Sequence, residues 1–168
     1  MPTRLPGNVG VTSNSAVPLY TVGKVFETED AAGRTAFHKY VQFKDAVAYL
    51  RGHVCCWADA AGTAVTNDRS GGSGIGAILQ AAGVCNAVMT QNYYGFIQIS
   101  GYALAIGDGS VAAEEAVVAH SVDGQMDTMA AGEEHLIFGT ALNADDTAND
   151  PLTTSAMSSS STSSLRSL

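Results

Sequence analysis

The hydrophobic and polar positions of this chain alternate in short segments that are separated by turn residues. Residues 35–43 are rich in aromatic and β-branched side chains, and residues 53–59 form a second apolar segment. Residues 93–106 carry the strongest alternation, with Gly101 at a predicted bulge or bend. Segments of this length and composition, bounded by glycine and polar residues, predict β-strands.

Residues 116–129 have the pattern of a β-hairpin. Asp123-Gly124 is a pair favoured in two-residue type I′ turns, and apolar residues flank it on both sides. A last strand is predicted over residues 135–143. Six or so short strands at turn-punctuated intervals indicate an all-β fold with an antiparallel β-barrel or β-sandwich core.

Two segments have a less definite pattern. Residues 44–52 predict a short helical turn that ends at Gly52. Residues 75–82 form a short apolar segment that fits either a strand or a helix. Neither segment changes the all-β prediction.

Composition divides the chain into three parts. Residues 1–20 carry one charge and three prolines, which excludes a helix and predicts an extended N-terminal arm. Residues 21–146 form the predicted β core, in which two β sub-parts, about 21–90 and 91–146, are an option. Residues 147–168 form a Ser/Thr-rich, low-complexity C-terminal tail that can bury almost no apolar surface.

The arm carries apolar side chains at spacings typical of an extended chain. One interpretation is a disordered leader. The alternative is an arm that lies along another subunit and adds backbone hydrogen bonds to the edge of its sheet. On that interpretation the partner-binding residues are Val9, Val11, Val17, Leu19 and Tyr20.

The chain has few charges and many small residues. Apolar residues make up 46% of the sequence, charged residues 14%, and 18 residues are glycine. Such a composition suits surfaces that are buried against neighbouring chains, where each charge would need a partner. The net charge is −8 and the basic residues are scattered singly, so we expect no direct binding of DNA or RNA.

The sequence also carries information about compartment. It has no run of 18 apolar residues, and its first 20 residues lack the apolar segment of a signal peptide, so we expect no membrane association and synthesis in the cytoplasm. Three cysteines without a CxxC spacing, Cys55, Cys56 and Cys85, predict buried thiols. Adjacent Cys55 and Cys56 point to opposite faces of a strand, so at most one is expected to face the core.

Several patterns suggest a cofactor or metal site, but each lacks part of its required context. Residues 72–77 fit the letters of a GxGxxG dinucleotide loop, yet a polar loop precedes them and no acid follows within 20 residues. His53 and the three cysteines lack the paired spacing that structural zinc needs. No Asp-x-Asp-x-Asp-Gly calcium loop occurs. We therefore expect no cofactor and no metal.

Carboxylates lie close in sequence to two histidines, His120 and His135, the acids being Asp123, Glu133 and Glu134. A carboxylate–histidine pair is one option, but surface charges next to turns are the simpler explanation. The adjacent acids at 114–115 and 133–134 diverge on an extended chain, which disfavours a two-carboxylate glycosidase. We predict no catalytic residues and no enzyme activity.

The second half of the chain carries an ordered set of short motifs. Residues 94–105 read Tyr-Gly-Phe-Ile-Gln-Ile-Ser-Gly-Tyr-Ala-Leu-Ala, and a Gly-Asp-Gly turn at 107–109 follows. The Asp-Gly hairpin comes next, and then Ile-Phe-Gly-Thr-Ala-Leu at 137–142. This order resembles small structural proteins of tailed bacteriophages, in particular capsid decoration (cement) and head-fibre-base proteins. It covers about residues 93–143, under a third of the chain.

The resemblance implies a compact β domain, often trimeric, that sits on the outer capsid surface of the virion and stabilises the junctions between capsomers. It implies two partners, the major capsid protein and other copies of this chain, and it carries over no catalytic residues. Two alternatives remain open. One is another self-assembling phage component, such as a tail, fibre or head-fibre base. The other is a β-barrel ligand-binding protein or enzyme that uses His120 and nearby acids.

Overall fold

The computed structural model describes residues 3–5, 10–29, 33–44, 48–68, 80–144 and 151–155. This part of the chain is essentially all-β, which confirms the predicted fold class. It contains one short 3₁₀ helix, η1 (Glu134–Leu136), and the following strands: β1 (Thr3–Arg4), β2 (Val25–Glu29), β3 (Thr35–Phe43), β4 (Val54–Trp57), β5 (Ala64–Thr66), β6 (Ala81–Cys85), β7 (Tyr94–Ser100), β8 (Ala103–Ile106), β9 (Ala116–Ala119), β10 (Met126–Thr128), β11 (Gly139–Ala141) and β12 (Pro151–Ser155).

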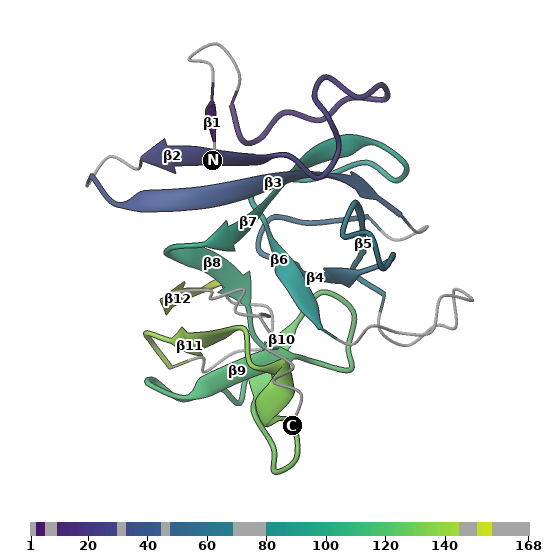
Figure 1. Cartoon of the computed structure of the whole chain (residues 1–168). Coiled ribbons are helices and arrows are strands. Elements are labelled where there is room, and N and C mark those ends of the chain that lie inside the picture. Colours follow the sequence, from purple (N-terminus) through teal and green to yellow (C-terminus); the bar gives the residue numbers. More distant parts are fainter. Residues whose placement is uncertain are drawn as a thin grey trace, which may run out of the picture.

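Five strands close into a barrel in the order β3–β5–β4–β6–β7 and back to β3 (Figure 1). The long strand β3 makes this possible because it pairs with β7 over residues 37–42 and with β5 at Gln42 and Phe43. Its first half also pairs with β2, and β1 pairs with β2 in turn, so the sheet extends beyond the barrel. Of the two predicted architectures, the barrel is the one observed.

A second sheet lies against the barrel, at the bottom of Figure 1, in the order β10–β9–β11–β12–β8. All of its pairings are antiparallel. A single bridge between Gly107, just after β8, and Met126 in β10 brings its two outer strands together. The second sheet therefore curls almost into a closed ring.

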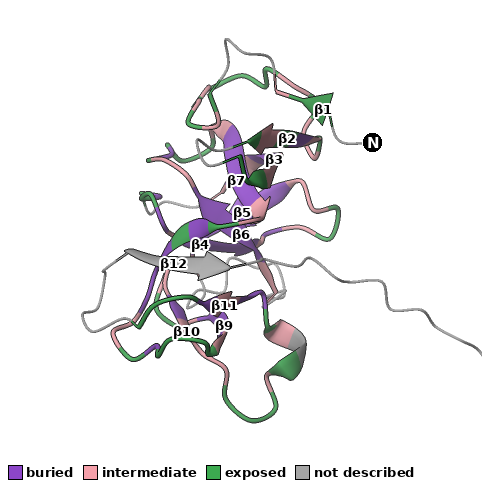
Figure 2. Cartoon of the chain, turned by 90° about the vertical axis from the view of Figure 1, so that its left-hand side faces the viewer, coloured by how far each residue is buried: buried purple, intermediate pink, exposed green. Residues whose placement is uncertain are grey.

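Buried apolar side chains form three clusters, and Figure 2 shows them concentrated along the stacked strands. The first cluster fills the barrel with side chains from all five of its strands: Val41, Phe43, Tyr49, Cys55, Val65, Ala82, Cys85, Met89 and Ile97. The second joins the barrel wall at β4 and β6 to the second sheet, and Val117 and Met126 lie at its centre, both fully buried. The third lies outside the barrel, around Phe26, Tyr40 and Phe96.

Both faces of β4 are buried, and this corrects one expectation. Cys55 and Cys56 do point to opposite sides, since Cys55 belongs to the barrel interior and Cys56 to the cluster between barrel and second sheet. At most one of them was expected to face a core, and both do. The second sheet is the reason, because it covers the outer face of the strand that would otherwise meet solvent.

The hairpin of β9 and β10 is confirmed, but its turn differs from the expected one. Met126 pairs with Ala119, so six residues connect the strands. A type I′ turn needs positive φ at both central residues, and only Gly124 (φ 77°), not Asp123, has it. The Gly124 N–H instead donates to Asn67, and its carbonyl accepts from Val54. The turn is therefore shaped by its contact with the barrel.

Three other predicted segments differ from the structure or lie largely outside its described residues. The described residues among 44–52 form a bridge at Tyr49 and a turn at Gly52, and none of them is helical. The strand expected over 135–143 begins only at Gly139, because η1 occupies its first part. Residues 72–77 and most of 75–82 lie outside the described residues. No helix in the described part of the chain has the length and hydropathy that crossing a membrane requires.

Candidate functional site

Residues 10–20 run along the outside of the barrel and are fastened to it through the backbone. Ser15 and Tyr94 exchange two N–H to carbonyl hydrogen bonds, of 3.0 and 2.8 Å, in an antiparallel bridge. The Leu19 N–H donates to the hydroxyl of Tyr40 at 3.0 Å. The segment thus adds to a sheet edge of its own chain. That it also lies along another subunit stays a prediction.

Tyr20 anchors the end of this segment in the third apolar cluster. Its ring meets Phe26 and Tyr40 edge-on, with centroids 5.0 and 5.3 Å apart, and Phe96 lies 5.9 Å away. Edge-to-face pairs at these distances are favourable beyond the area that they bury. Val11 packs against the same cluster. The contacts of Tyr20 and Val11 therefore fold the segment onto the barrel.

The five residues predicted to bind a partner separate into two groups. Val17 and Leu19 are 64% and 55% exposed. They lie two positions apart, in a part of the segment that bends at residues 16, 17, 19 and 20. Val11 and Tyr20 are partly buried inside their own chain, and Val9 lies outside the described residues. Val17 and Leu19 remain the candidates for a contact with a partner.

A second exposed apolar pair lies close to residues that the same segment contacts, since the Asn14 side-chain amide donates to the Thr90 hydroxyl at 2.9 Å. Tyr49 and Met89 form an antiparallel bridge, which places Leu50 opposite Val88. These two side chains are 47% and 62% exposed. Single exposed apolar residues are normal, but pairs that share a face are candidate contact points.

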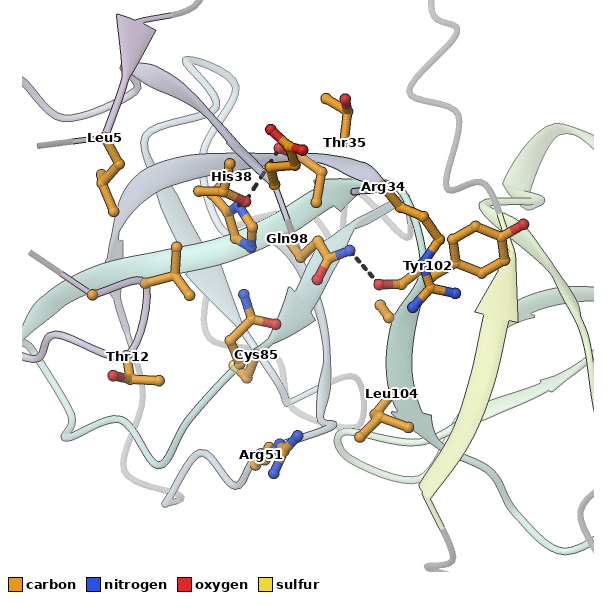
Figure 3. Close-up of a pocket in the computed structure, with 17 residues that line it drawn as sticks. Leu5, Thr12, Arg34, Thr35, His38, Arg51, Cys85, Gln98, Tyr102 and Leu104 are labelled. Atoms are coloured by element: carbon orange, nitrogen blue, oxygen red, sulfur yellow. Dashed lines mark hydrogen bonds between the residues drawn. The ribbon is translucent and has the colours of Figure 1, made fainter. Parts of the chain in front are cut away.

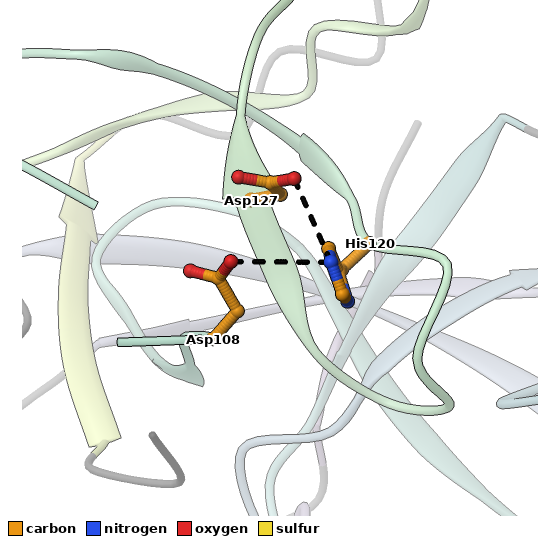
Figure 4. A group of neighbouring side chains, drawn as sticks. All are labelled: Asp108, His120 and Asp127. Carbon is orange, nitrogen blue, oxygen red and sulfur yellow. Dashed lines mark ion pairs between the residues drawn. The ribbon is translucent and has the colours of Figure 1, made fainter. Parts of the chain in front are cut away.

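The second sheet holds a polar cluster of Asp108, His120 and Asp127 (Figure 4). The Nε2 atom of His120 lies 3.9 Å from Asp108 Oδ2 and 3.6 Å from Asp127 Oδ2. Each carboxylate is held by its other oxygen, Asp108 Oδ1 by the Ser110 N–H and Asp127 Oδ1 by the Thr128 N–H. The cluster stands beside the Gly107–Met126 bridge that brings the sheet edges together.

The hydrogen bonding of His120 decides what this cluster can do. The three side chains offer ligand atoms within 4.8 Å of one another, which is compact enough for a metal ion. However, Nδ1 of His120 accepts the Val122 N–H at 2.9 Å. The ring proton must then sit on Nε2, toward the carboxylates, whereas a metal ligand needs a bare Nε2 and a proton on Nδ1. The geometry therefore favours a histidine that bridges two aspartates.

Asp123, the acid considered as an optional partner of His120, acts on a different histidine. Its charge raises the pKa of His53, although burial has the larger effect and lowers that pKa overall. His53 Nδ1 contacts the side-chain amide of Asn67 at 3.0 Å.

Cys55 and Cys85 meet inside the barrel with their Sγ atoms 3.2 Å apart, while Cys56 lies on the other face of β4. The four residues of the hypothetical zinc set do not converge.

The adjacent glutamates support their own turns. Glu115 accepts the Ala112 N–H, Glu133 accepts the Ala130 N–H, and Glu134 accepts the Gly132 N–H, each through a side-chain oxygen. These contacts fit the interpretation of the acids as turn residues. The side chain of His135 lies outside the described residues.

A pocket of about 610 Å³ lies outside the barrel, between residues 10–12, strands β2 and β3, and the bend between β7 and β8 (Figure 3). We call it the arginine pocket. Its volume is in the range of small-ligand sites. The charged, polar and aromatic residues that matter below are Glu29, Arg34, His38, Arg51, Asn86, Gln98 and Tyr102.

His38 forms the inner wall of the arginine pocket and is only 3% exposed. Its Nδ1 lies 3.2 Å from the Thr28 hydroxyl, which itself donates to the Ala36 carbonyl. The direction of the hydrogen bond between Thr28 and His38 is set by which ring nitrogen carries the proton. Burial lowers the pKa of His38 to about 4, and the ring is neutral at neutral pH.

Sequence reasoning missed the arginine pocket and the aspartate partners of His120. No motif marks the pocket, because Arg34, Arg51 and Tyr102 are brought together only by barrel closure and by the β7–β8 bend. The His120 cluster had a weak signal. The hairpin places Asp127 near His120 once its register is known, but the longer loop changes that register.

The sequence of this chain matches no protein family and no curated protein.

Proposed function

We propose that this chain is a non-enzymatic structural protein of a tailed-bacteriophage virion. It binds the outer surface of the capsid through the major capsid protein and stabilises the junctions between capsomers as a homotrimer. Weak contacts repeated by symmetry, and by more than one point of attachment per subunit, add up to firm binding.

The observation that carries this proposal is the pair of exposed apolar side chains, Val17 and Leu19, on a segment whose backbone is fixed to the barrel. A fixed segment loses little conformational entropy when a partner covers it, so its apolar side chains are efficient contact points. Leu50 and Val88 supply a second such pair on the same chain. A trimer that bridges capsomers needs one surface for its own copies and another for the shell.

The resemblance to phage decoration proteins gives further support. Its motifs occupy residues 93–143, which in the fold comprise β7 and four of the five strands of the second sheet. The segment also supplies most of the buried cluster around Val117 and Met126, which joins the second sheet to the barrel. The filled barrel interior also suits a protein whose task is to resist deformation.

The test is co-sedimentation of the purified protein with undecorated phage shells. The double variant Val17→Asp/Leu19→Asp is expected to lower the bound fraction strongly, because it places two charges in the contact. Val122→Asp changes another exposed valine (51%), at the tip of the β9–β10 hairpin, and is the control. Equal binding of the double variant and the control would show that Val17 and Leu19 do not contact the shell.

The mass of the protein in solution tests the trimer. Sedimentation equilibrium should give a particle of three times the 17.2 kDa chain mass. A monomer that binds shells would agree with the proposed attachment and contradict the proposed trimer. The alternative placement in a tail or fibre predicts co-sedimentation with tails and none with shells.

A further inference from the structure

His38 and Gln98 lie side by side in the lining of the arginine pocket (Figure 3). They are opposite each other in the pairing of β3 with β7, so their side chains stand next to each other on one face of the sheet. Both are more than nine-tenths buried, with 3% and 6% of their surface exposed. We call this pair the polar wall. Buried polar groups normally have hydrogen-bond partners, so each atom of the polar wall can be accounted for.

One polar atom of each side chain is left over. The amide nitrogen of Gln98 donates to the carbonyls of Ser100 and Tyr102, at 3.2 and 2.6 Å. These two bonds fix the orientation of the amide, and its oxygen Oε1 receives no hydrogen bond from the described residues. His38 uses Nδ1 for its contact with the Thr28 hydroxyl at 3.2 Å, and its Nε2 has no partner in the same part of the chain.

These two atoms are open to the pocket. In the part of the chain that the structure describes, the polar side-chain atoms that are sealed and lack a partner are Asn67 Oδ1 and Asn86 Nδ2. His38 Nε2 and Gln98 Oε1 lack a partner without being sealed, and in Figure 3 both face the hollow. Asn86 thus forms part of the lining without offering its amide nitrogen, whereas the polar wall offers two atoms to a ligand.

The hydrogen-bonding character of the two atoms selects a hydroxylated ligand. Gln98 Oε1 only accepts, so the group bound there must donate. His38 is neutral, and the Thr28 hydroxyl can donate to Nδ1 or accept from it, so Nε2 can present either a proton or a lone pair. A hydroxyl both donates and accepts. Two neighbouring hydroxyls therefore satisfy both atoms, whichever ring nitrogen carries the proton.

A charged group is disfavoured at the polar wall. An anion offers only acceptors and would face the lone pairs of Gln98 Oε1. A cation would meet the same environment that lowers the pKa of His38 to about 4, in which burial destabilises a positive charge. The ligand group is therefore a neutral one.

The charged residues of the pocket have other contacts or lie elsewhere. Arg34 stacks on the ring of Tyr102, 4.4 Å from its centroid. Glu29 lies 3.5 Å from Arg4. Figure 3 shows Arg51 on another side of the hollow, away from the polar wall. Ligand selection thus falls to the uncharged polar wall.

The remaining lining suits the C–H groups of a ring. The pocket has a volume of about 610 Å³, in the range of small-ligand sites. Apolar side chains make up a large part of its lining: Leu5, Val11, Ala36, Ala103 and Leu104. A ligand with neighbouring hydroxyls on one side and C–H groups on another matches this division, and a sugar ring has that composition.

We propose that the arginine pocket binds a neutral sugar. One hydroxyl donates to Gln98 Oε1, a neighbouring hydroxyl forms a hydrogen bond with His38 Nε2, and the C–H groups of the ring meet the apolar lining. The unpaired atoms of the polar wall belong to side chains of two paired strands and not to a free sheet edge, which favours a small molecule over an extended peptide. This binding site goes beyond the proposed function and does not depend on it.

An NMR titration of the full chain tests the pocket directly. The probes are the methyl glycosides of glucose, galactose and mannose, and the signals followed are the ring nitrogens of His38 and the side-chain amide of Gln98. We expect at least one glycoside to shift both signals with a roughly millimolar Kd, because few hydrogen bonds are formed. Glucuronic acid and glucosamine, the charged controls, should bind at least about tenfold more weakly.

His38→Leu removes one of the two ligand contacts at similar side-chain bulk and is expected to lower the affinity by about tenfold. His120→Leu removes a histidine outside the pocket and should leave the affinity almost unchanged. Melting temperatures show whether each variant is folded. Leu104→Trp, which narrows the pocket, and its control Leu142→Trp serve as a second pair, because the two leucines are similarly exposed, at 37% and 40%.

Three results would overturn the proposal. The first is that no neutral glycoside shifts the signals of His38 and Gln98 at up to about 50 mM. The second is equal or tighter binding of a charged sugar. The third is binding of N-methylacetamide at the same signals in place of the glycosides, which would make the pocket a site for a peptide group. Co-sedimentation with shells is independent of all three, so the sugar site and the capsid attachment succeed or fail separately.

Discussion

Two separate features of the structure require glycine at position 124. Its φ of 77° lies in the left-handed region, and a Cβ there would lie 2.6 Å from the ring of His53. His53 is itself held by Asn67, whose carbonyl accepts the Gly124 N–H. A single glycine therefore joins the hairpin of the second sheet to the barrel.

Gly124→Ala is expected to destabilise the protein by about 2 kcal/mol or more, because the new methyl group adds a clash to an unfavourable φ. Gly132→Ala is the matched control. Gly132 has φ 93° but has nothing within 4 Å of an added Cβ, so only the backbone cost of about 1 kcal/mol remains. Urea unfolding of both variants measures the difference, and equal losses would show that the His53 contact is unimportant.

His38 should make stability depend on pH. Its pKa is lowered by burial from 6.5 to about 4, so the unfolded chain binds a proton in this window and the folded chain does not. Stability is then complete above about pH 7 and falls as the pH drops from about 6.5 to 4, by at most roughly 3 kcal/mol. The lowered pKa of His53 acts in the same direction.

Denaturant unfolding of the wild type and of His38→Gln at pH 7.5 and pH 5 tests this dependence. Glutamine can keep a hydrogen bond to Thr28 but does not titrate. We expect the variant to lose clearly less stability between the two pH values than the wild type. Identical losses in the two proteins would mean that another group titrates in this range.

At the scale of elements, residues 10–20 behave as part of the barrel. Removing residues 1–20 would test an arm that binds a partner only if the core did not depend on these residues. The structure makes that deletion a poor test, because the bridge from Ser15 to Tyr94 and the ring of Tyr20 would be lost with it. Point substitutions separate the two roles of the segment.

Tyr20→Ala is expected to destabilise the protein by roughly 2 kcal/mol, since a partly buried ring is removed from an aromatic cluster. Leu19→Ala should change stability by no more than about 0.5 kcal/mol, because its side chain is exposed. Thermal unfolding compares them. A neutral Tyr20→Ala would mean that the segment leaves the barrel easily and is free to act as an arm.

Cys55 in β4 and Cys85 in β6 are placed to join two barrel strands covalently. Their Sγ atoms are 3.2 Å apart, against ~2.05 Å in a disulfide, so a small movement suffices. Burial and the neighbouring Cys85 raise the pKa of the Cys55 thiol, so thiolate is scarce and oxidation should be slow.

We expect prolonged treatment with excess oxidised glutathione to form this bond. Two thiols lose their hydrogens as glutathione disulfide is reduced to two glutathione molecules, and the chain mass falls by about 2 Da. Cys85→Ala should abolish the change, and Cys56→Ala should preserve it, because Cys56 lies on the other face of β4. A mass loss that needs Cys56 would contradict the assignment.

The sequence predicts best those strands whose own side chains strongly favour the β conformation. Residues 35–43 are dense in aromatic and β-branched side chains, and β3 begins and ends at those bounds. The β9–β10 hairpin was predictable for the same reason. Its turn type was not, because Gly124 bonds to Asn67 and Val54, which are distant in sequence. Likewise η1 replaces the start of a predicted strand where no local signal indicates it.

At the scale of the whole molecule, the choice of a barrel over a sandwich and the covering of β4 by the second sheet were beyond sequence reasoning. Both depend on the register between distant strands, such as β3 with β7, which periodicity does not specify. The arginine pocket and the His120 cluster follow from those registers, so they were missed with them. The all-β class needed only the local pattern.

The pairing of β3 with both β5 and β7 sets an order of events during synthesis. β3 ends at Phe43, but its barrel partner β7 ends at Ser100, so the barrel cannot close until about 57 further residues have been made. At ~5–20 residues per second a ribosome needs roughly three to twelve seconds for this stretch. During that interval one edge of the longest and most aromatic strand has no partner. A nascent chain released early should therefore aggregate, and slow folding with long-range contacts is expected of the complete chain.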